Sequence, residues 1–353
     1  MTEKPLQSTG SPETNKTRAF TGARRFSVAP MMDWSDRHCR HLWRIISKNA
    51  FLYSEMVTTG ALIHGDRERF LRFHPAEHPL ALQLGGSSPE DLAACSKMAE
   101  QWGYDEVNLN CGCPSDRVQN GMIGAILMGH PQLVADCIKA MQDAVSIDVT
   151  VKHRIGIDDM EDYSGLCNFV ETVAKTDCQT FIVHARKAWL QGLSPKENRE
   201  IPPLQYGMVH QLKQDYPELE VIINGGITTL EQCQSHLVES EEYGVQLDGV
   251  MVGREAYTNP YMLAEVDQQL YADDRPIVTR TEVAQQFIDY CREEITQGTQ
   301  LKHMSRHVLG LFQGVRGAKM FRRHISENAH KPDASISILE DALALVDETR
   351  SYA

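Results

Sequence analysis

The sequence predicts an α/β fold, namely a (β/α)8 TIM barrel followed by a smaller C-terminal all-helical domain. Eight short apolar, β-branched runs recur between Phe26 and Glu255, with helix-like segments between them. After Pro260 this alternation stops and only amphipathic helical patterns follow. The length of 353 residues suits a barrel of about 250 residues plus an extra module.

The predicted strands are short runs bounded by turn residues. Near-continuous apolar strands that alternate with helices indicate a parallel sheet covered on both faces. Eight such units favour a closed barrel over a doubly wound open sheet, which is the alternative. The runs span residues 26–31, 51–57, 80–86, 106–112, 149–155, 181–186, 221–227 and 249–255.

Helices are expected between these strands. Ser88 to Trp102 begins with an N-cap serine, a proline at the first helical position and the acidic Glu90. The segments 131–145 and 229–237 show the same pattern. Beyond the barrel, helices are expected over 281–295, 303–312, 318–326 and 335–346, and no strand is expected from Thr281 onward.

The chain therefore divides into a flexible N-terminal tail over residues 1–24, a barrel over 25–272 and a helical domain over 277–353. The tail lacks the apolar core of a signal peptide. No stretch approaches the roughly 20 apolar residues of a membrane span. The nine cysteines are an odd, scattered set, which indicates a reducing, cytoplasmic location rather than a disulfide framework.

Polar residues gather where several predicted strands end. In TIM barrels the active site lies at the carboxyl ends of the strands, and buried strand ends rarely carry many polar side chains unless they face a ligand. Each residue alone has a structural explanation, such as a satisfied core histidine or a surface lysine. The polar strand-end residues are Gln83, Asn108, Asn110, Lys152, Arg154, His184, Arg186, Asn224 and Arg254.

Two glycines after the seventh strand suggest a phosphate site. Asn224, Gly225 and Gly226 precede Thr228, which can begin the next helix, and Gly253-Arg254 follows the eighth strand. Glycine amides and a helix N-terminus can approach a phosphate closely, and phosphate sites after strands seven and eight recur in this fold. The alternative is a pair of ordinary turn glycines.

Cys113 is the candidate acid. It lies in the segment Asn110-Cys111-Gly112-Cys113-Pro114, and the following proline holds it in extended backbone. A free thiol is mostly protonated at neutral pH and can therefore donate a proton. The sequence offers no second cysteine pair or histidine spacing for zinc, so no metal is expected. The alternative is a buried, inert thiol.

Basic residues are concentrated in two segments, although the formal net charge of −13 opposes nucleic-acid binding. The segment from Leu301 to His324 contains no Asp or Glu. Local charge decides nucleic-acid binding, so these segments could hold phosphates, the alternative being a solvated helix face. The basic residues are Lys302, Arg306, Arg316, Lys319, Arg322 and Arg323, with Arg186, Lys187, Lys196 and Arg199 after strand six.

Together these motifs resemble the tRNA-dihydrouridine synthases, in particular their A-type subfamily. The resemblance covers the chain from about Arg25 onward. The most specific motifs are GCPSDRVQNGMIGAILM and SPKENREIPPL. Further support comes from PMMDW, VKHRIG, NGGI, GRE and LGLFQGVRGAKMFRRHISENA.

The resemblance implies FMN as cofactor and NADPH as reductant. It assigns FMN contacts to Pro30, Met31, Met32, Gln83, Lys152, His184, Asn224, Gly225, Gly226, Gly253 and Arg254. It makes Cys113 the proton donor and places Asn110 against the substrate base. It implies tRNA contacts from Lys196, Arg199, Lys319 and Arg322, and the basic charge of the loop after strand six adds Arg186 to this set. Cys111 departs from the pattern, which has an apolar residue there.

The implied reaction reduces a uridine in the D-loop of tRNA, near positions 20 and 20a, with hydride delivered to C6 and a proton from Cys113 to C5. We expect a monomer with no membrane partner. One alternative is an FMN barrel that acts on a small pyrimidine-like molecule. Another is a non-enzymatic RNA-binding protein that retained a barrel, which the dense polar strand ends argue against.

Overall fold

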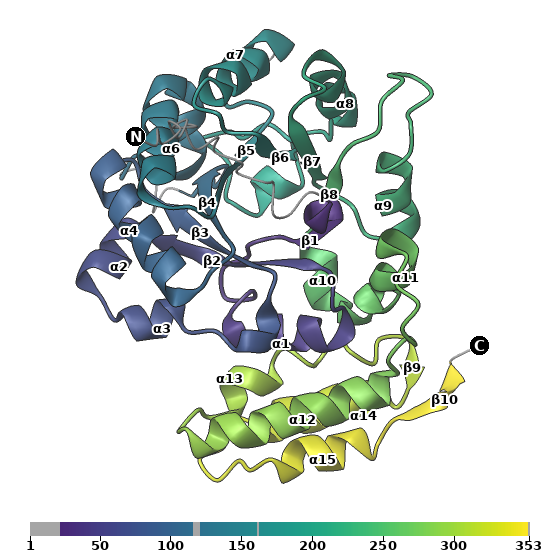
Figure 1. The fold of residues 1–353 in the computed structure, drawn as a ribbon. Coiled ribbons are helices and arrows are strands. Elements are labelled where there is room, and N and C mark those ends of the chain that lie inside the picture. Colours follow the sequence, from purple (N-terminus) through teal and green to yellow (C-terminus); the bar gives the residue numbers. More distant parts are fainter. Residues whose placement is uncertain (1–21, 116–120, 161, 352–353) are drawn as a thin grey trace, which may run out of the picture.

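The computed structural model describes residues 22–115, 121–160 and 162–351. A closed barrel of eight parallel strands forms its larger part, as predicted, and β1 closes it against β8. Helices surround the barrel, and a helical module packs on one side (Figure 1). The strands are β1 (Phe26–Val28), β2 (Phe51–Thr58), β3 (Leu80–Gly85), β4 (Glu106–Cys111), β5 (Asp148–Arg154), β6 (Thr180–His184), β7 (Glu220–Asn224) and β8 (Gly249–Val252).

Successive side chains of each strand point alternately into the barrel and outward to the helices, so the apolar residues form two separate cores. Inward-facing residues, among them Phe51, Tyr53, Ile182 and Met251, fill the barrel interior. Outward-facing residues join the helices in a much larger core. The surrounding helices are α1 (Arg37–Ile46), α2 (Thr59–His64), α3 (Arg67–Leu71), α4 (Pro89–Trp102), α6 (Pro131–Ala144), α7 (Tyr163–Ala174), α8 (Tyr206–Asp215), α9 (Leu230–His236), α10 (Arg254–Thr258) and α11 (Val266–Tyr271).

The C-terminal module is built from α12 (Arg280–Thr296), α13 (Leu301–Ser305), α14 (Ala318–Asn328) and α15 (Ser337–Leu343). The expectation that it contains no strand is wrong, because β9 (Val315–Arg316) pairs antiparallel with β10 (Asp347–Ser351). A two-residue strand leaves no periodic signal in a sequence.

The helix predicted over 303–312 is also wrong in its extent, since α13 ends at Ser305 and turns follow. Gly310 explains part of this difference. A side chain at Gly310 would collide with the Thr258 backbone carbonyl and with Pro260, so the chain passes close to the barrel at this point instead of continuing as a helix.

The module docks on α1 through polar and aromatic contacts. Tyr290 of α12 is hydrogen-bonded to His38 at 2.7 Å and stacks on His41 with ring centroids 3.9 Å apart. Asp36, which caps the N-terminus of α1, also pairs with Arg306 at 2.7 Å and His307 at 2.9 Å. Helix α1 and its capping residue are therefore bonded directly to the C-terminal module.

The N-terminal boundary lies earlier than predicted. Residues 1–21 of the predicted tail lie outside the described residues. Arg24, which was assigned to the tail, is only 2% exposed and extends beneath the barrel. Its guanidinium pairs with Glu106 at 2.7 Å, Asp148 at 2.5 Å and Glu220 at 3.1 Å. A buried cation with three carboxylate partners is part of the barrel and not of a tail.

Candidate active site

A chain of hydrogen-bonded polar side chains runs through the barrel interior to the carboxyl ends of β3 and β4. Gln83 donates to Asn108 at 2.8 Å, and Asn108 donates to Thr150 at 2.8 Å. Both amide side chains are almost completely buried. Their partners fix the orientation of Gln83, so the groups that it presents at the barrel mouth are preorganised.

Asn110 connects this chain to the loop that carries Cys113. Its amide nitrogen donates to the Gln83 oxygen at 2.8 Å, and its own oxygen accepts from the backbone amides of Gly112 and Cys113 at 3.1 and 3.0 Å. Asn110 was predicted to touch the substrate base. In this structure its side chain holds the Cys113 loop, and the contact to a base stays a prediction.

The two neighbouring cysteines lie in different environments. Cys111 is completely buried on β4, and burial raises the pKa of its thiol well above the ordinary value. Cys113 is partly exposed. The Cys113 carbonyl accepts a hydrogen bond from Ala125 at 2.8 Å, and a side chain at Gly124 would collide with that carbonyl. The sequence favoured Cys113 as the reacting thiol, and its greater accessibility supports that prediction. Residues 116–120 of the same motif lie outside the described residues.

Lys152 on β5 lies at the mouth with its ammonium group 3.0 Å from the Asn224 side-chain oxygen. Asn224 is oriented in turn by donating to the Met251 carbonyl at 2.8 Å. Burial, with a smaller contribution from the nearby Arg154 cation, lowers the pKa of Lys152 to about 7. No carboxylate in the described part of the chain forms an ion pair with Lys152, so an anionic ligand would stabilise its charged form.

His184 ends β6 beside these cations. Burial lowers the pKa of its imidazole well below the ordinary value, and Arg154, Lys152 and Arg186 add to this shift. The ring is therefore neutral at physiological pH and can both donate and accept a hydrogen bond.

Two residues to which the sequence assigned no ligand contact, Arg154 and Asn198, hold the loops of the site together. Arg154 donates to three backbone carbonyls, those of Gly112, Lys187 and Asn198, at 2.8 to 3.0 Å. Asn198 is fully buried and binds both the amide and the carbonyl of Trp189. These bonds join the Cys113 loop to the loop after β6. The basic side chain of Arg154 gave no sequence signal for this structural role.

The predicted phosphate residues lie at the ends of β7 and β8. Gly225 and Gly226 have positive φ angles of 120° and 70°, which favour glycine. We name these two residues the glycine cradle. Gly253 has room for a side chain, because an added Cβ would meet its nearest atom only at 3.7 Å. Arg254 begins α10 and pairs with Glu200 at 3.0 Å, with both side chains about half exposed.

The remaining predicted FMN contacts come from the β1–α1 loop. Pro30 and Met31 are partly buried, whereas Met32 is 58% exposed. The loop is fixed by Ser35, whose hydroxyl accepts from the Met31 amide at 2.8 Å. It is fixed also by Glu55, which accepts from the Asp33 amide at 2.6 Å.

The predicted tRNA contacts fall on two separate elements. Lys196 and Arg199 are exposed in the loop after β6, and Arg186 of that loop bonds the Pro202 carbonyl. Lys319 and Arg322 are exposed on α14. Among the described residues, neither has an acidic partner, whereas Arg306 and Arg323 pair with Asp36 and Glu327.

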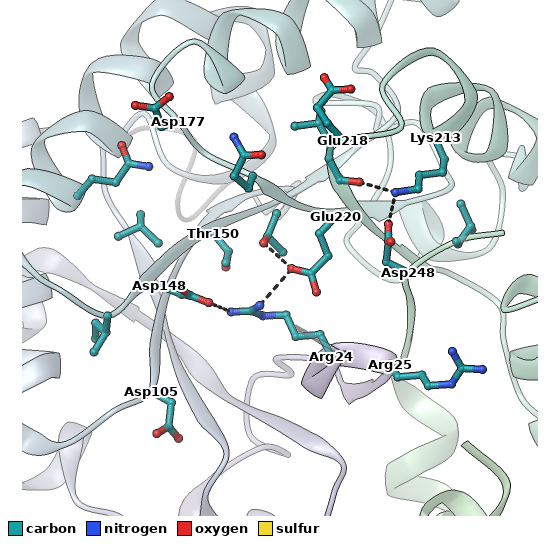
Figure 2. Close-up of a pocket in the computed structure, with 18 of the residues that line it drawn as sticks. Arg24, Arg25, Asp105, Asp148, Thr150, Asp177, Lys213, Glu218, Glu220 and Asp248 are labelled. Carbon is teal, nitrogen blue, oxygen red and sulfur yellow. Dashed lines mark hydrogen bonds and ion pairs between the residues drawn. The ribbon is translucent and has the colours of Figure 1, made fainter. Parts of the chain in front are cut away.

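A second hollow lies at the opposite end of the barrel (Figure 2). It measures about 850 Å³ and is lined by Arg24, Asp148, Glu220, Lys213 and Asp248 among others. Its charged groups pair with one another, as Lys213 does with Asp248 at 2.8 Å. Because TIM-barrel chemistry is built at the carboxyl ends of strands, we place the candidate site at the mouth.

Within the described ranges, no group of three or more His, Cys, Asp and Glu side chains is arranged to hold a metal ion. In those same ranges, no helix has the length and apolar character needed to cross a membrane.

Comparisons with known proteins agree with this geometry. The family model described as dihydrouridine synthase (Dus) matches residues 27–347. A tRNA-dihydrouridine(20/20a) synthase of Yersinia pestis is 57% identical over 334 residues, which cover 94% of each chain. Proteins of the same name from Pseudomonas putida and Escherichia coli K12 are 56% and 58% identical, covering 97% and 92% of this chain and 98% and 92% of theirs. The chain therefore belongs to the dihydrouridine synthase family of enzymes.

Proposed function

We propose that this enzyme reduces uridine to 5,6-dihydrouridine in the D-loop of tRNA, at positions 20 and 20a, with FMN as cofactor and NADPH as reductant. The relatives are named tRNA-dihydrouridine(20/20a) synthases, which supports the substrate and its positions. The observation that carries the chemistry is the meeting of the Cys113 loop, Lys152 and the glycine cradle at the mouth of one barrel.

The mouth residues fit an FMN molecule. The backbone amide of Gly226 in the glycine cradle could donate to a phosphate group, and Arg254 begins the helix that follows the neighbouring strand β8. Lys152 and Gln83 present polar hydrogen atoms that suit the oxygen and nitrogen atoms of a flavin ring. A lysine without a carboxylate partner suits a ring that becomes negatively charged on reduction.

Bound FMN, once reduced by NADPH, supplies the hydride that reaches C6 of the uracil. The protein supplies the other half of the reaction. Asn110 holds the backbone amides of Gly112 and Cys113, and Arg154 holds the Gly112 carbonyl. These bonds place the Cys113 thiol, which donates its proton to C5. Lys152 would stabilise the negative charge of a reduced flavin ring with its ammonium group.

The two basic elements bind the RNA backbone on either side of the mouth. Lys196 and Arg199 approach phosphates from the loop after β6, and Lys319 and Arg322 approach them from α14. The target uridine leaves its base stack to enter the barrel. We further propose that the enzyme acts as a monomer in the cytoplasm.

A product assay tests the proposal. We would incubate the enzyme with NADPH and tRNA that lacks dihydrouridine, digest the RNA and measure the modified nucleoside by mass spectrometry. The proposal expects uridines at positions 20 and 20a to gain two hydrogen atoms. Formation of no dihydrouridine by a flavin-loaded enzyme would contradict it.

A further inference from the structure

Tyr206, the first residue of α8, is bonded to the glycine cradle. Its hydroxyl donates to the Gly225 carbonyl at 2.6 Å. The ring is half-buried and packs edge-on against His236, with ring centroids 4.8 Å apart. The packing of the Tyr206 ring on His236 therefore holds the hydroxyl in place beside the glycine cradle.

This hydrogen bond determines how the Gly225–Gly226 peptide is turned. In a trans peptide the carbonyl oxygen and the amide hydrogen point in opposite directions. Because Tyr206 draws the Gly225 carbonyl toward α8, the amide of Gly226 points away from that helix. Within the described part of the chain, the Gly226 amide has no hydrogen-bond acceptor.

Steric contacts on the same side of the cradle agree with this orientation. A Cβ atom on Gly226 would lie 2.5 Å from a methyl group of Leu204 and 3.1 Å from the Tyr206 hydroxyl. A Cβ atom on Gly225 would lie 2.8 Å from the His184 ring and 3.1 Å from Leu204. Leu204 and Tyr206 thus occupy the space beside Gly226, and His184 and Leu204 occupy the space beside Gly225, so both positions require glycine.

We propose that Tyr206 is a positioning residue for the phosphate group of the cofactor. Its hydroxyl fixes the Gly225–Gly226 peptide so that the Gly226 amide donates to a phosphate monoester, while Tyr206 itself touches no ligand. The inference rests on the proposed use of FMN and adds a residue to the site. Without the hydroxyl, the flexible glycine peptide can rotate and the amide is no longer preorganised.

The test compares two flavins that differ only in the phosphate. The Tyr206→Phe variant of the full chain, freed of flavin, is titrated with FMN and with riboflavin. We expect FMN binding to weaken about five- to tenfold, as for the loss of one ordered hydrogen bond, and riboflavin binding to change less than about twofold. The control is Tyr243→Phe, because the Tyr243 ring stacks on His210 nearby without a bond to Gly225.

An equal loss of affinity for both flavins would show a general structural role and overturn the inference, and so would unchanged FMN binding. If riboflavin binds too weakly to measure, the ³¹P resonance of bound FMN decides. It should shift in Tyr206→Phe and not in Tyr243→Phe, and an unshifted resonance would overturn the inference. A wild-type protein that binds neither flavin would instead contradict the cofactor assignment itself.

Discussion

Both ends of the barrel bury charged groups, but the two ends differ in whether these groups have counter-ions. At the amino ends of the strands, the Arg24 guanidinium meets three carboxylates. Figure 2 shows two of them, Asp148 and Glu220, and the pair of Lys213 with Asp248. At the carboxyl ends, Lys152 bonds the Asn224 side-chain oxygen and pairs with no carboxylate among the described residues, and burial lowers its pKa to about 7. Paired charges stabilise a fold, whereas a buried charge without its counter-ion is suited to bind a ligand.

This difference also bears on where a ligand would bind. The hollow drawn in Figure 2 lies at the amino ends, where Arg24 and Lys213 already pair with carboxylates. The mouth presents a partly exposed thiol, a lysine, a neutral histidine and a glycine peptide. We therefore expect substitutions at the mouth to change activity and substitutions at the amino ends to change stability.

The largest expected effect on activity is that of substituting Cys113 at the mouth. Cys113→Ala should lower the rate of tRNA reduction by roughly 100-fold or more, because the proton donor is lost. Binding of FMN and oxidation of NADPH should persist. Single-turnover assays with tRNA measure the loss, and Cys111→Ala is the matched control that should keep most of the activity. Full activity of Cys113→Ala would refute its role.

At the opposite end, Arg24→Met should lower the free energy of unfolding by about 3–5 kcal/mol, because Glu106 would remain buried without its cation. The turnover of the protein that stays folded should be unchanged. Urea unfolding and activity at low temperature measure the two quantities. Arg25→Met is the control, since the Arg25 side chain is more exposed. A lower turnover with an unchanged free energy of unfolding would contradict the view that the amino ends of the barrel serve stability and not activity.

The protonation state of Lys152 should make the rate of flavin reduction depend on pH. Its ammonium form is present below a pKa of about 7 and is lost as the pH rises, and an anionic ligand moves that transition upward. Flavin reduction by NADPH should therefore slow above neutral pH. In Lys152→Met the rate should be roughly tenfold lower and the dependence on pH should disappear. Stopped-flow absorbance between pH 6 and 9 tests this, and an unchanged profile in the variant would exclude Lys152 as its source.

The smallest expected effects concern α14. Lys319→Ala and Arg322→Ala should each weaken tRNA binding a few-fold and lower the slope of log affinity against log salt by about one. Filter binding over a range of salt concentrations measures the slope. Lys139→Ala is the control, because Lys139 lies on α6 and pairs with Asp143. An equal change in the control would mean that binding depends only on net charge.

The eight strands could be predicted because each is a short apolar run within a regular alternation of strands and helices, and the barrel confirms them. Parallel strands in a closed barrel have their carboxyl ends at one end, so the sequence could also predict which polar residues lie at the mouth. The role of Arg24 was missed, because its three partners lie 82, 124 and 196 residues away and no local pattern encodes such contacts.

Long-range contacts likewise explain the other differences. The turns after Ser305 depend on the approach of Gly310 to Thr258. The tie between Tyr206 and Gly225 depends on how α8 packs beside β7. The apolar periodicity of one segment carries no information about either contact.

The most direct test of the central claim is anaerobic. We would reduce the flavin-loaded enzyme with NADPH, remove excess reductant, add tRNA that lacks dihydrouridine and follow the flavin absorbance. The account predicts rapid reoxidation by this tRNA and none by free uridine. A flavin that NADPH reduces but that stays reduced with tRNA would contradict the account and would favour a small pyrimidine-like substrate.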